Sequence, residues 1–409
     1  MTTEILHTKS DISFSSEIAP IVNNLSALTL AKNVPQRLAP LLAHLKQQTL
    51  NSLHKIEEQQ GDFQICGPDW SRQNSEAAGK DHAEIIIKTY GTTYALPNKD
   101  PKANKQALDS GNLDLYMMYK NHDPVGTACM VFNANGWAEL GRAASLGGVG
   151  NQLIQNLRII RWLTEDPISN RSIGLFATCR TAPDRNIGTE QNPEKMRGGQ
   201  AVSHIWANMP DIMVGGLGPL YKKHGALEQF AYTFVANKTA WVPAEAYIAN
   251  PSDKNFVTEW FQKYQVSKKD VPVSGVIRAD ENRFSVGYPP LESGITHLVH
   301  GEVFISDQLG QQSLEESLLK LAQVEVPFVQ VQIPIDRNSI PVQEFLSANG
   351  FQAFLFTPGI ADHQPPLLWF GKKTHGVPVV DTFWKDDTDM NPFWAGNLAL
   401  HALRIANKW

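Results

Sequence analysis

The sequence predicts an α/β protein of the α+β kind, with two mixed-sheet domains in tandem behind an N-terminal helical segment. Three observations predict this fold. Short β-prone runs separated by turn-forming residues fill 113–145. A periodic apolar segment and then an apolar run of strand length follow them. The alternation of strands and helices returns after residue 243, so we predict a helical segment at 1–60 and domains at 61–243 and 244–409.

The composition is that of an ordinary globular protein. The 409 residues are 42% hydrophobic and 19% charged, with a formal net charge of −5. This acidic balance argues against nucleic-acid binding through a general basic field. The N-terminal residues lack a signal-peptide pattern, and no apolar run approaches the roughly 18 residues of a membrane span. We therefore expect a cytoplasmic protein with no nucleic-acid or membrane partner.

The cysteines and histidines give no pattern of a metal site. Three widely spaced cysteines form neither a metal motif nor a disulfide framework, so no metal is expected and a reducing compartment fits best. Cys179 is expected to be a small buried hydrophobe. His204 and His224 stand alone. His297 and His300 lie three apart in a predicted strand, on opposite faces, so they should not share a metal.

Helices and strands alternate in the first half of the chain. Apolar residues at spacings of three and four in 1–60 predict helices that pack as a cap on the body of the protein. A strand at 62–66 and helices at 75–90 and 101–111 come next. Strands at 113–120, 125–132 and 137–145 form an antiparallel meander, because Asn, Asp, Pro and Gly cluster between them. After the next helix, a strand at 172–180 should pair in parallel beside the third meander strand.

The second half repeats the order of elements without repeating the residues. A hairpin is expected within 271–288, and helices at 253–266, 313–326 and 340–350. Further strands are expected at 294–306, 327–336, 351–360 and 365–371.

A glycine-rich turn separates the meander from its following helix. Three glycines lie within the four positions 147–150, and a periodic apolar helix begins near Asn151. Such a turn presents backbone N–H groups, and the helix N-terminus adds partial positive charge, so the pair suits a phosphate. A P-loop is excluded because no Lys-Ser or Lys-Thr follows Gly150, and the dinucleotide fingerprint lacks its third glycine and its acidic residue. Alone, the turn also fits a simple tight connection.

The run "SLGGVG" (145–150) and its surroundings resemble the Gcn5-related N-acetyltransferase (GNAT) superfamily over about residues 62–235. "VGTACMVF" and "AELGRAAS" resemble its third and fourth strands and "LFATCR" its fifth. "LYKKHGALEQFAYTF" is similar to its tyrosine-bearing fourth helix and the strand after it. The sequence departs from the family at Ser145, where Gln or Arg is usual, and in the longer segment 180–220. The second half also looks like a GNAT fold, without the glycine-rich loop.

The resemblance implies an acyl-CoA-dependent N-acyltransferase. Acetyl-CoA or another acyl-CoA is the co-substrate, the amine of a small molecule is the acceptor, and transfer is direct within a ternary complex. It implies Glu139 as a base and Tyr221 as a general acid near the CoA sulfur. Strand alternation places Trp137, Glu139, Gly141 and Ala143 on one face. The implied CoA-binding residues are Ala143, Ala144, Ser145, Gly147, Gly148, Val149, Gly150, Asn151, Gln152 and Leu153.

Other functions stay open at this point. Ser145 favours a degenerate member that serves as a CoA-binding or sensor module. A third possibility keeps the fold but takes the acyl group from an acyl carrier protein or an aminoacyl-tRNA, and the acidic balance counts against tRNA. Glu139 also fits a solvated or salt-bridged carboxylate, and Tyr221 a packing tyrosine. A homodimer is left open.

Overall fold

The computed structural model describes the residues in fourteen stretches: 11–90, 99–132, 136–146, 150–172, 174–180, 213–223, 226–236, 247–251, 253, 282–287, 301–305, 328–335, 339–357 and 367–373. The chain divides into two compact units, residues 1–177 with 184–201 and residues 178–183 with 202–409. This division falls earlier than the predicted boundary at residue 243, and the domain assignment stays a prediction.

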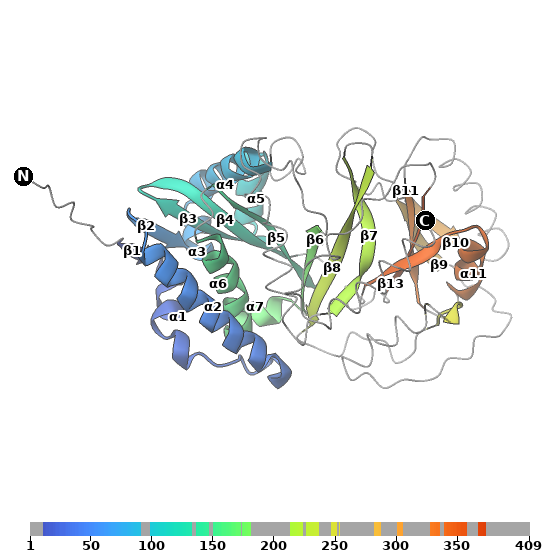
Figure 1. The fold of residues 1–409 in the computed structure, drawn as a ribbon, viewed down its shortest axis with the longest axis horizontal. Helices are drawn as coiled ribbons and strands as arrows, with labels where there is room; N and C mark the ends of the chain where they lie inside the picture. The colour runs from blue at the N-terminus through green and yellow to red at the C-terminus, as the bar shows by residue number, and fades with distance from the viewer. Residues whose placement is uncertain are drawn as a thin grey trace, which may run out of the picture. The chain divides into compact units, whose positions relative to one another are not determined.

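The first unit is built on a mixed sheet with the strand order β1-β2-β3-β4-β5-β6 (Figure 1). The strands are β1 (Ile12–Phe14), β2 (Phe63–Cys66), β3 (Leu113–Lys120), β4 (Asp123–Phe132), β5 (Trp137–Ser145) and β6 (Gly174–Arg180). Neighbours from β2 to β5 are antiparallel, whereas β1 pairs with β2, and β6 with β5, in parallel. The predicted meander, the parallel strand after it and the mixed α/β fold class are confirmed.

Helices cover both faces of this sheet. They are α1 (Ala19–Asn23), α2 (Ala39–Glu57), α3 (Pro68–Gln73), α4 (Ser75–Tyr90), α5 (Pro101–Asp109), α6 (Asn151–Thr164) and α7 (Asp166–Arg171). Ile85 of α4 and Leu108 of α5 share a buried core with Leu115 and Met117 of β3. On the other face α2 and α6 pack together (Figure 1). The predicted packing of an N-terminal helix on the body is confirmed.

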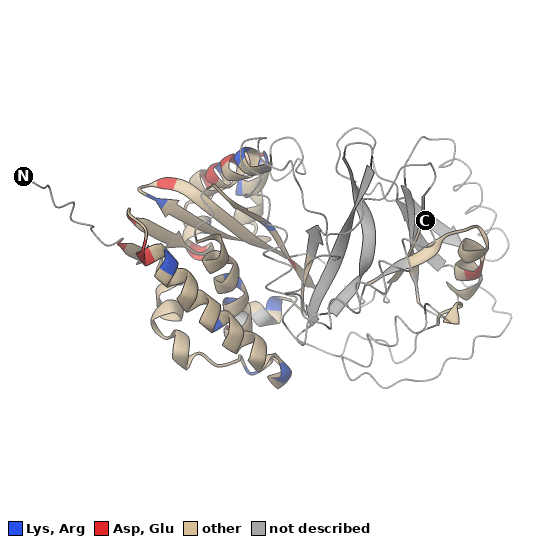
Figure 2. Ribbon diagram, in the orientation of Figure 1, with Lys and Arg blue, Asp and Glu red and all other residues tan. Residues whose placement is uncertain are grey.

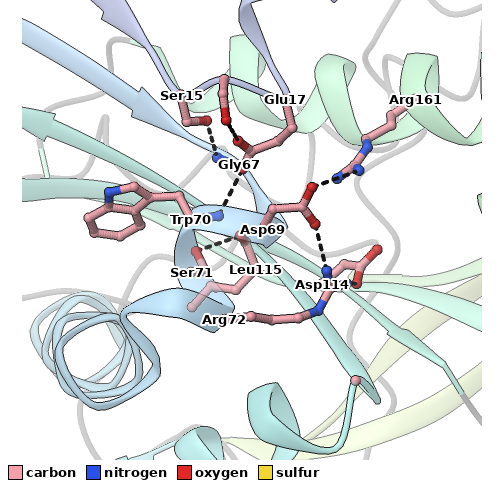
Figure 3. A network of polar contacts seen from close by, with 12 residues as sticks. Ser15, Glu17, Gly67, Asp69, Trp70, Ser71, Arg72, Asp114, Leu115 and Arg161 are labelled. Atoms are coloured by element: carbon pink, nitrogen blue, oxygen red, sulfur yellow. Dashed lines mark hydrogen bonds and ion pairs between the residues drawn. The ribbon is translucent and has the colours of Figure 1, made fainter.

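The N-terminal segment was predicted to be helical throughout. It also contains a strand, β1, which extends the sheet beyond β2. Ser15 Oγ accepts a hydrogen bond from Gly67 N–H over 2.9 Å, and Glu17 Oε1 accepts one from Trp70 N–H over 3.0 Å (Figure 3). These contacts supply partners for N–H groups at the start of α3, which its own backbone leaves unpaired. A three-residue strand is too short to leave a period-2 pattern.

The second unit contains a run of antiparallel strands, in the order β8-β7-β12-β13-β11-β9-β10. Its elements are β7 (Met213–Lys223), β8 (Ala226–Ala236), β9 (Asn282–Gly287), β10 (Gly301–Ile305), β11 (Phe328–Pro334), α11 (Ile340–Ala348), β12 (Gln352–Thr357) and β13 (Leu367–Lys373). The helix predicted at 340–350 and the strands at 327–336, 351–360 and 365–371 are confirmed. The helix predicted at 313–326 lies outside the described residues, as does the helix predicted at 253–266 apart from residue 253.

Charged side chains of both signs are spread over the described elements of the first unit (Figure 2). In the part of the chain that the structure describes, none of the helices combines the length and the apolar character needed to cross a membrane.

Candidate functional site

A β-bulge in β5 shapes the candidate site. Thr127 of β4 pairs with Ala144, whereas Cys129 pairs with Gly141, so β5 has one residue more than β4 between these two pairs. Arg142 lies in the bulge with φ at +50°, in the left-handed region that residues other than glycine rarely adopt. A bulge of this kind bends the strand and redirects the side chains around it.

The bulge corrects one prediction about faces. Simple alternation would place Trp137, Glu139, Gly141 and Ala143 on one side of β5. The extra residue shifts the alternation, so that Ala144 rather than Ala143 lies on the side of Gly141. Ala144 is buried there, in the core under α4 and α5.

The parallel pairing of β5 with β6 is short. It joins Trp137, Ala138 and Glu139 to Gly174, Leu175 and Phe176. Both strands continue, β5 to Ser145 and β6 to Arg180, and no pairing between them is described beyond Glu139. The described β5–β6 pairing covers residues 137–139 of β5, and the strand residues implied to bind CoA, 143–145, follow them along the strand.

Helix α6 begins directly after the glycine-rich turn, as predicted. Its N-cap Gly150 has φ at +83°, and a Cβ on it would lie 2.1 Å from Met118 Sδ, so only glycine fits. The first intrahelical bond runs from Ile154 N–H to Gly150 O over 3.2 Å, so the N–H groups of 151–153 precede it. Within the described residues no side chain caps this helix, and its first turn has no acidic residue. Such a terminus favours an anion.

Arg158 ties α6 to the bulge. Its side chain is buried, and Nη1 donates to the backbone oxygens of Cys129 and Gly141, the latter over 3.2 Å. These two residues form the strand pair at one edge of the bulge. The helix that starts at the glycine-rich turn is thereby fixed to the strand that carries Glu139.

Glu139 is the one carboxylate of β5, and it is half-buried. Its Oε1 lies 2.9 Å from where a Cβ on Gly141 would stand, so the carboxyl group rests against the strand beside the bulge. Burial raises the pKa of Glu139 above its ordinary value of 4.5, and the charges of Arg142 and Arg158 offset part of that rise. A carboxyl group with a raised pKa is a better proton acceptor when ionised.

His82 of α4 is a buried neutral neighbour of the bulge. Its Nδ1 lies 2.7 Å from Thr127 Oγ1, and Nε2 has no hydrogen-bond partner among the described residues. Burial, helped by the charge of Arg142, lowers the pKa of His82 from 6.5 to about 3. The imidazole therefore adds no charge to the site at neutral pH.

We expect acid to destabilise the protein through His82. Its pKa is lower in the folded state than the unfolded value of 6.5, so the unfolded chain binds the proton first, and stability is lost as the pH falls from 6.5 towards about 3. Urea unfolding between about pH 7 and pH 5 should show a shallower loss for His82→Gln than for the wild type. The exposed His54 of α2 supplies the control, His54→Gln, which should keep the wild-type slope. Equal slopes for all three proteins would contradict the prediction.

The structure places the predicted CoA-binding residues on two adjacent elements. Ala143, Ala144 and Ser145 end β5, and Asn151, Gln152 and Leu153 follow the N-cap Gly150 in α6. Gln152 Nε2 donates to Gln48 Oε1 of α2 over 3.1 Å, so the N-terminal segment packs beside the start of α6. Gly147, Gly148, Val149, His204, His224, His297, His300 and the side chain of Cys179 lie outside the described residues.

Tyr221 does not lie in a helix, which corrects the prediction for "LYKKHG". It lies in β7, where it pairs with Glu228 of β8. Pairing with the strand that follows in the hairpin, β8, decides the backbone here over the helical propensity of the local sequence. Tyr221 also belongs to the second compact unit, whereas Glu139 belongs to the first.

Sequence reasoning missed three residues at the bulge, namely His82, Arg142 and Arg158. One signal was available for Arg158, because it follows Ile154 by four positions and so shares the apolar face of α6. A charged residue within such a face is seldom accidental. The described residues contain no cluster of three or more His, Cys, Asp or Glu side chains that could hold a metal ion.

No protein-family model matches the chain, and no curated protein matches it in sequence. Solved structures do show similarity. An acetyltransferase of the GNAT family from Streptococcus pneumoniae is 12% identical, with 39% of this chain and 95% of that chain covered and a TM-score of 0.29. An aminoglycoside 6'-N-acetyltransferase complexed with coenzyme A is 10% identical, with 41% and 94% covered and a TM-score of 0.28.

A third similar structure is the ribosomal-protein-S18-alanine N-acetyltransferase from Escherichia coli, which is 10% identical, with 40% of this chain and 90% of that chain covered and a TM-score of 0.26. Similarity at this level carries no argument about activity. The mixed α/β fold of the first unit rests on its own strand order and pairing.

Proposed function

We propose that this protein is an acyl-CoA-dependent N-acyltransferase that transfers an acyl group, such as acetyl, directly from CoA to the amine of a small molecule. One observation carries the proposal. The described β5–β6 pairing includes Glu139, and β5 leads towards the N-terminus of α6, which no described side chain caps. This arrangement brings an anion-binding helix end and a half-buried carboxyl group to one strand.

The N-terminus of α6 and the turn before it would hold the pyrophosphate of CoA. The N–H groups of 151–153 precede the first intrahelical bond, and no charge competes for them in the first turn. The pantetheine arm would lie along residues 143–145. A backbone N–H of β5 would stabilise negative charge on the thioester oxygen.

Glu139 would act as the base, directly or through a water molecule. The amine attacks the thioester carbon, the new C–N bond forms as the C–S bond breaks, and Glu139 takes the proton that the amine loses. The CoA thiolate leaves, and Tyr221 is retained as the proposed proton donor to it on the sequence resemblance alone. The tandem arrangement, the cytoplasmic location and a role of the second domain beside the acceptor remain part of the proposal.

The experiment that tests CoA binding is a thermal shift with acetyl-CoA and desulfo-CoA on the whole chain. Ligand at 100 times Kd should stabilise the protein by about 2.7 kcal/mol. No shift with either compound contradicts the proposal. A shift without thiol release, in the presence of a panel of small amines, favours the sensor module instead.

Asn151→Asp is expected to separate CoA binding from folding. A carboxylate in the first turn of α6 favours the helix by about 0.3–1 kcal/mol, which offsets part of the cost of placing charge where Asn151 Oδ1 is buried, so the free variant should stay folded with a Tm close to that of the wild type. The same charge opposes a phosphate, so Kd for desulfo-CoA should rise by about tenfold, a cost of about 1.4 kcal/mol. Titration calorimetry measures the change. Gln106→Glu on exposed α5 adds equal charge elsewhere and should leave Kd unchanged; weakening by both variants alike points to overall charge.

A further inference from the structure

The bulge in β5 carries more positive than negative charge. Arg142 and Arg158 both act on Glu139 and on Cys129. The Asp114 carboxylate also acts on Cys129, but Arg72 and Arg171 already bind it, so Glu139 is the carboxylate left to face Arg142 and Arg158. His82 is buried as a neutral imidazole and contributes nothing to the balance. One guanidinium charge is therefore in excess over the described groups that influence one another there.

The excess guanidinium charge is that of Arg142. Arg158 donates to two backbone carbonyl groups at the bulge, whereas none of the described residues accepts a hydrogen bond from Arg142 or lies in an ion pair with it. The side chain of Arg142 is half-buried, so the cost of removing its charge from water is only partly avoided.

Other arginines of the first unit behave differently. Arg72 and Arg171 bind the carboxylate of Asp114, and Arg161 binds that of Glu165. These three guanidinium groups are paired with carboxylates, whereas no such partner of Arg142 is found among the residues that the structure describes.

The backbone conformation of Arg142 also supports a functional role for this residue. Its φ of +50° costs roughly 1–2 kcal/mol for a side chain with a Cβ, and a glycine would avoid this. Strain of this kind persists where the position serves a function. Here the strained position presents a planar, permanently charged group that suits bidentate binding of a carboxylate.

We propose that the substrate bound beside β5 carries a carboxylate, which pairs with Arg142. This inference rests on the proposed function and deepens it. Residues 143–145 separate Arg142 from the glycine-rich turn, so Arg142 lies at the thioester end of the proposed CoA path and not at its phosphate end. Two sources supply this chemistry, namely a carboxyacyl group on the donor and a carboxylate on the acceptor amine.

The test has one arm for each source. In the donor arm, acyl transfer from succinyl-CoA is compared with transfer from acetyl-CoA. In the acceptor arm, β-alanine is compared with β-alaninamide, both as acceptors and as ligands that raise the Tm of the protein loaded with desulfo-CoA. In at least one arm, we expect the wild type to transfer to or from the compound with the carboxylate at a rate about tenfold higher, or more, than for the compound without it. A tenfold preference is the usual scale for one charge-assisted hydrogen-bonding pair.

Arg142→Gln should abolish that preference, and Arg142→Lys should keep part of it. Arg142→Gly relaxes the backbone, so it should lose the preference while its Tm stays at or above the wild-type value, which separates binding from folding. Lys80→Gln, an exposed change on α4, is the charge control and should keep the preference.

The inference is overturned if the wild type favours neither carboxylate, or if a preference survives in Arg142→Gln. In both cases an intact Tm shift with desulfo-CoA shows that the proposed function still stands. Loss of that shift in the wild type removes the proposed function and this inference together.

Discussion

Replacing Glu139 with Gln is expected to lower kcat/KM for N-acyl transfer by about 10²- to 10⁴-fold, the range that a general base contributes. The amide keeps the shape of the side chain beside Gly141 but cannot take a proton from the amine. Thiol release from acyl-CoA in the presence of the amine acceptor measures the rate. Glu84→Gln on the exposed face of α4 is the matched control and should keep the wild-type rate.

The pH dependence distinguishes loss of a base from loss of structure. Wild-type kcat/KM should rise as Glu139 ionises, with a midpoint above the ordinary pKa of 4.5, and this limb should disappear in Glu139→Gln. The raised pKa of Glu139 contributes stability that is present at low pH and lost as the pH rises through that pKa. Near neutral pH the variant should therefore be at least as stable as the wild type. An unchanged rate in Glu139→Gln would assign the carboxylate to a structural role.

Replacing Asp114 with Ala is expected to lower the free energy of unfolding by about 3 kcal/mol, the low end of the range for breaking a buried ion pair. The Asp114 side chain is 2% exposed and accepts hydrogen bonds from Arg72 and, over 3.2 Å, from Arg171. Its partners are 31% and 35% exposed, so water can reach the charges left behind, which places the estimate at the low end. Figure 3 shows Asp114 beside Arg72 and Asp69.

The loss should exceed that of an ordinary surface pair, because Asp114 belongs to a network. Arg72 also binds Asp69 over 2.7 Å, and Arg161 lies 3.8 Å from Asp69, so deleting Asp114 leaves more guanidinium than carboxylate groups. Urea unfolding measures the change. Lys88→Ala breaks an exposed i,i+4 pair with Glu84 on α4 and should cost no more than about 0.5 kcal/mol. Similar losses for the two variants would show that the network adds nothing to a surface pair.

Local patterns predicted most of the first unit. The turn residues between 113 and 145 placed three strands correctly, and the apolar repeat from Asn151 placed α6. The parallel partner of β5 followed from the rule that a strand after a crossover helix lies beside the strand before it. Each of these depends on residues near one another in sequence.

What the sequence did not predict depends on how a strand pairs with its neighbour in the sheet. Nothing in "WAELGRAAS" marks Arg142 as the extra residue of a bulge, because the register is set against β4. For the same reason the strand around Tyr221 was taken for a helix. Glu139 was predicted from the resemblance to the GNAT superfamily, whereas the guanidinium groups that act on it were identified only from the fold.

The hydrogen bonds from Gly67 and Trp70 to the N-terminal segment bear on the order of events during synthesis. Ser15 and Glu17 leave the ribosome 52 and 53 residues before their respective partners. The growing chain must therefore wait, with β1 unpaired, until β2 and α3 emerge and the long segment between β1 and β2, which carries α1 and α2, folds back. The residues of β1 are thus made before their partners but are among the last of this sheet edge to be secured.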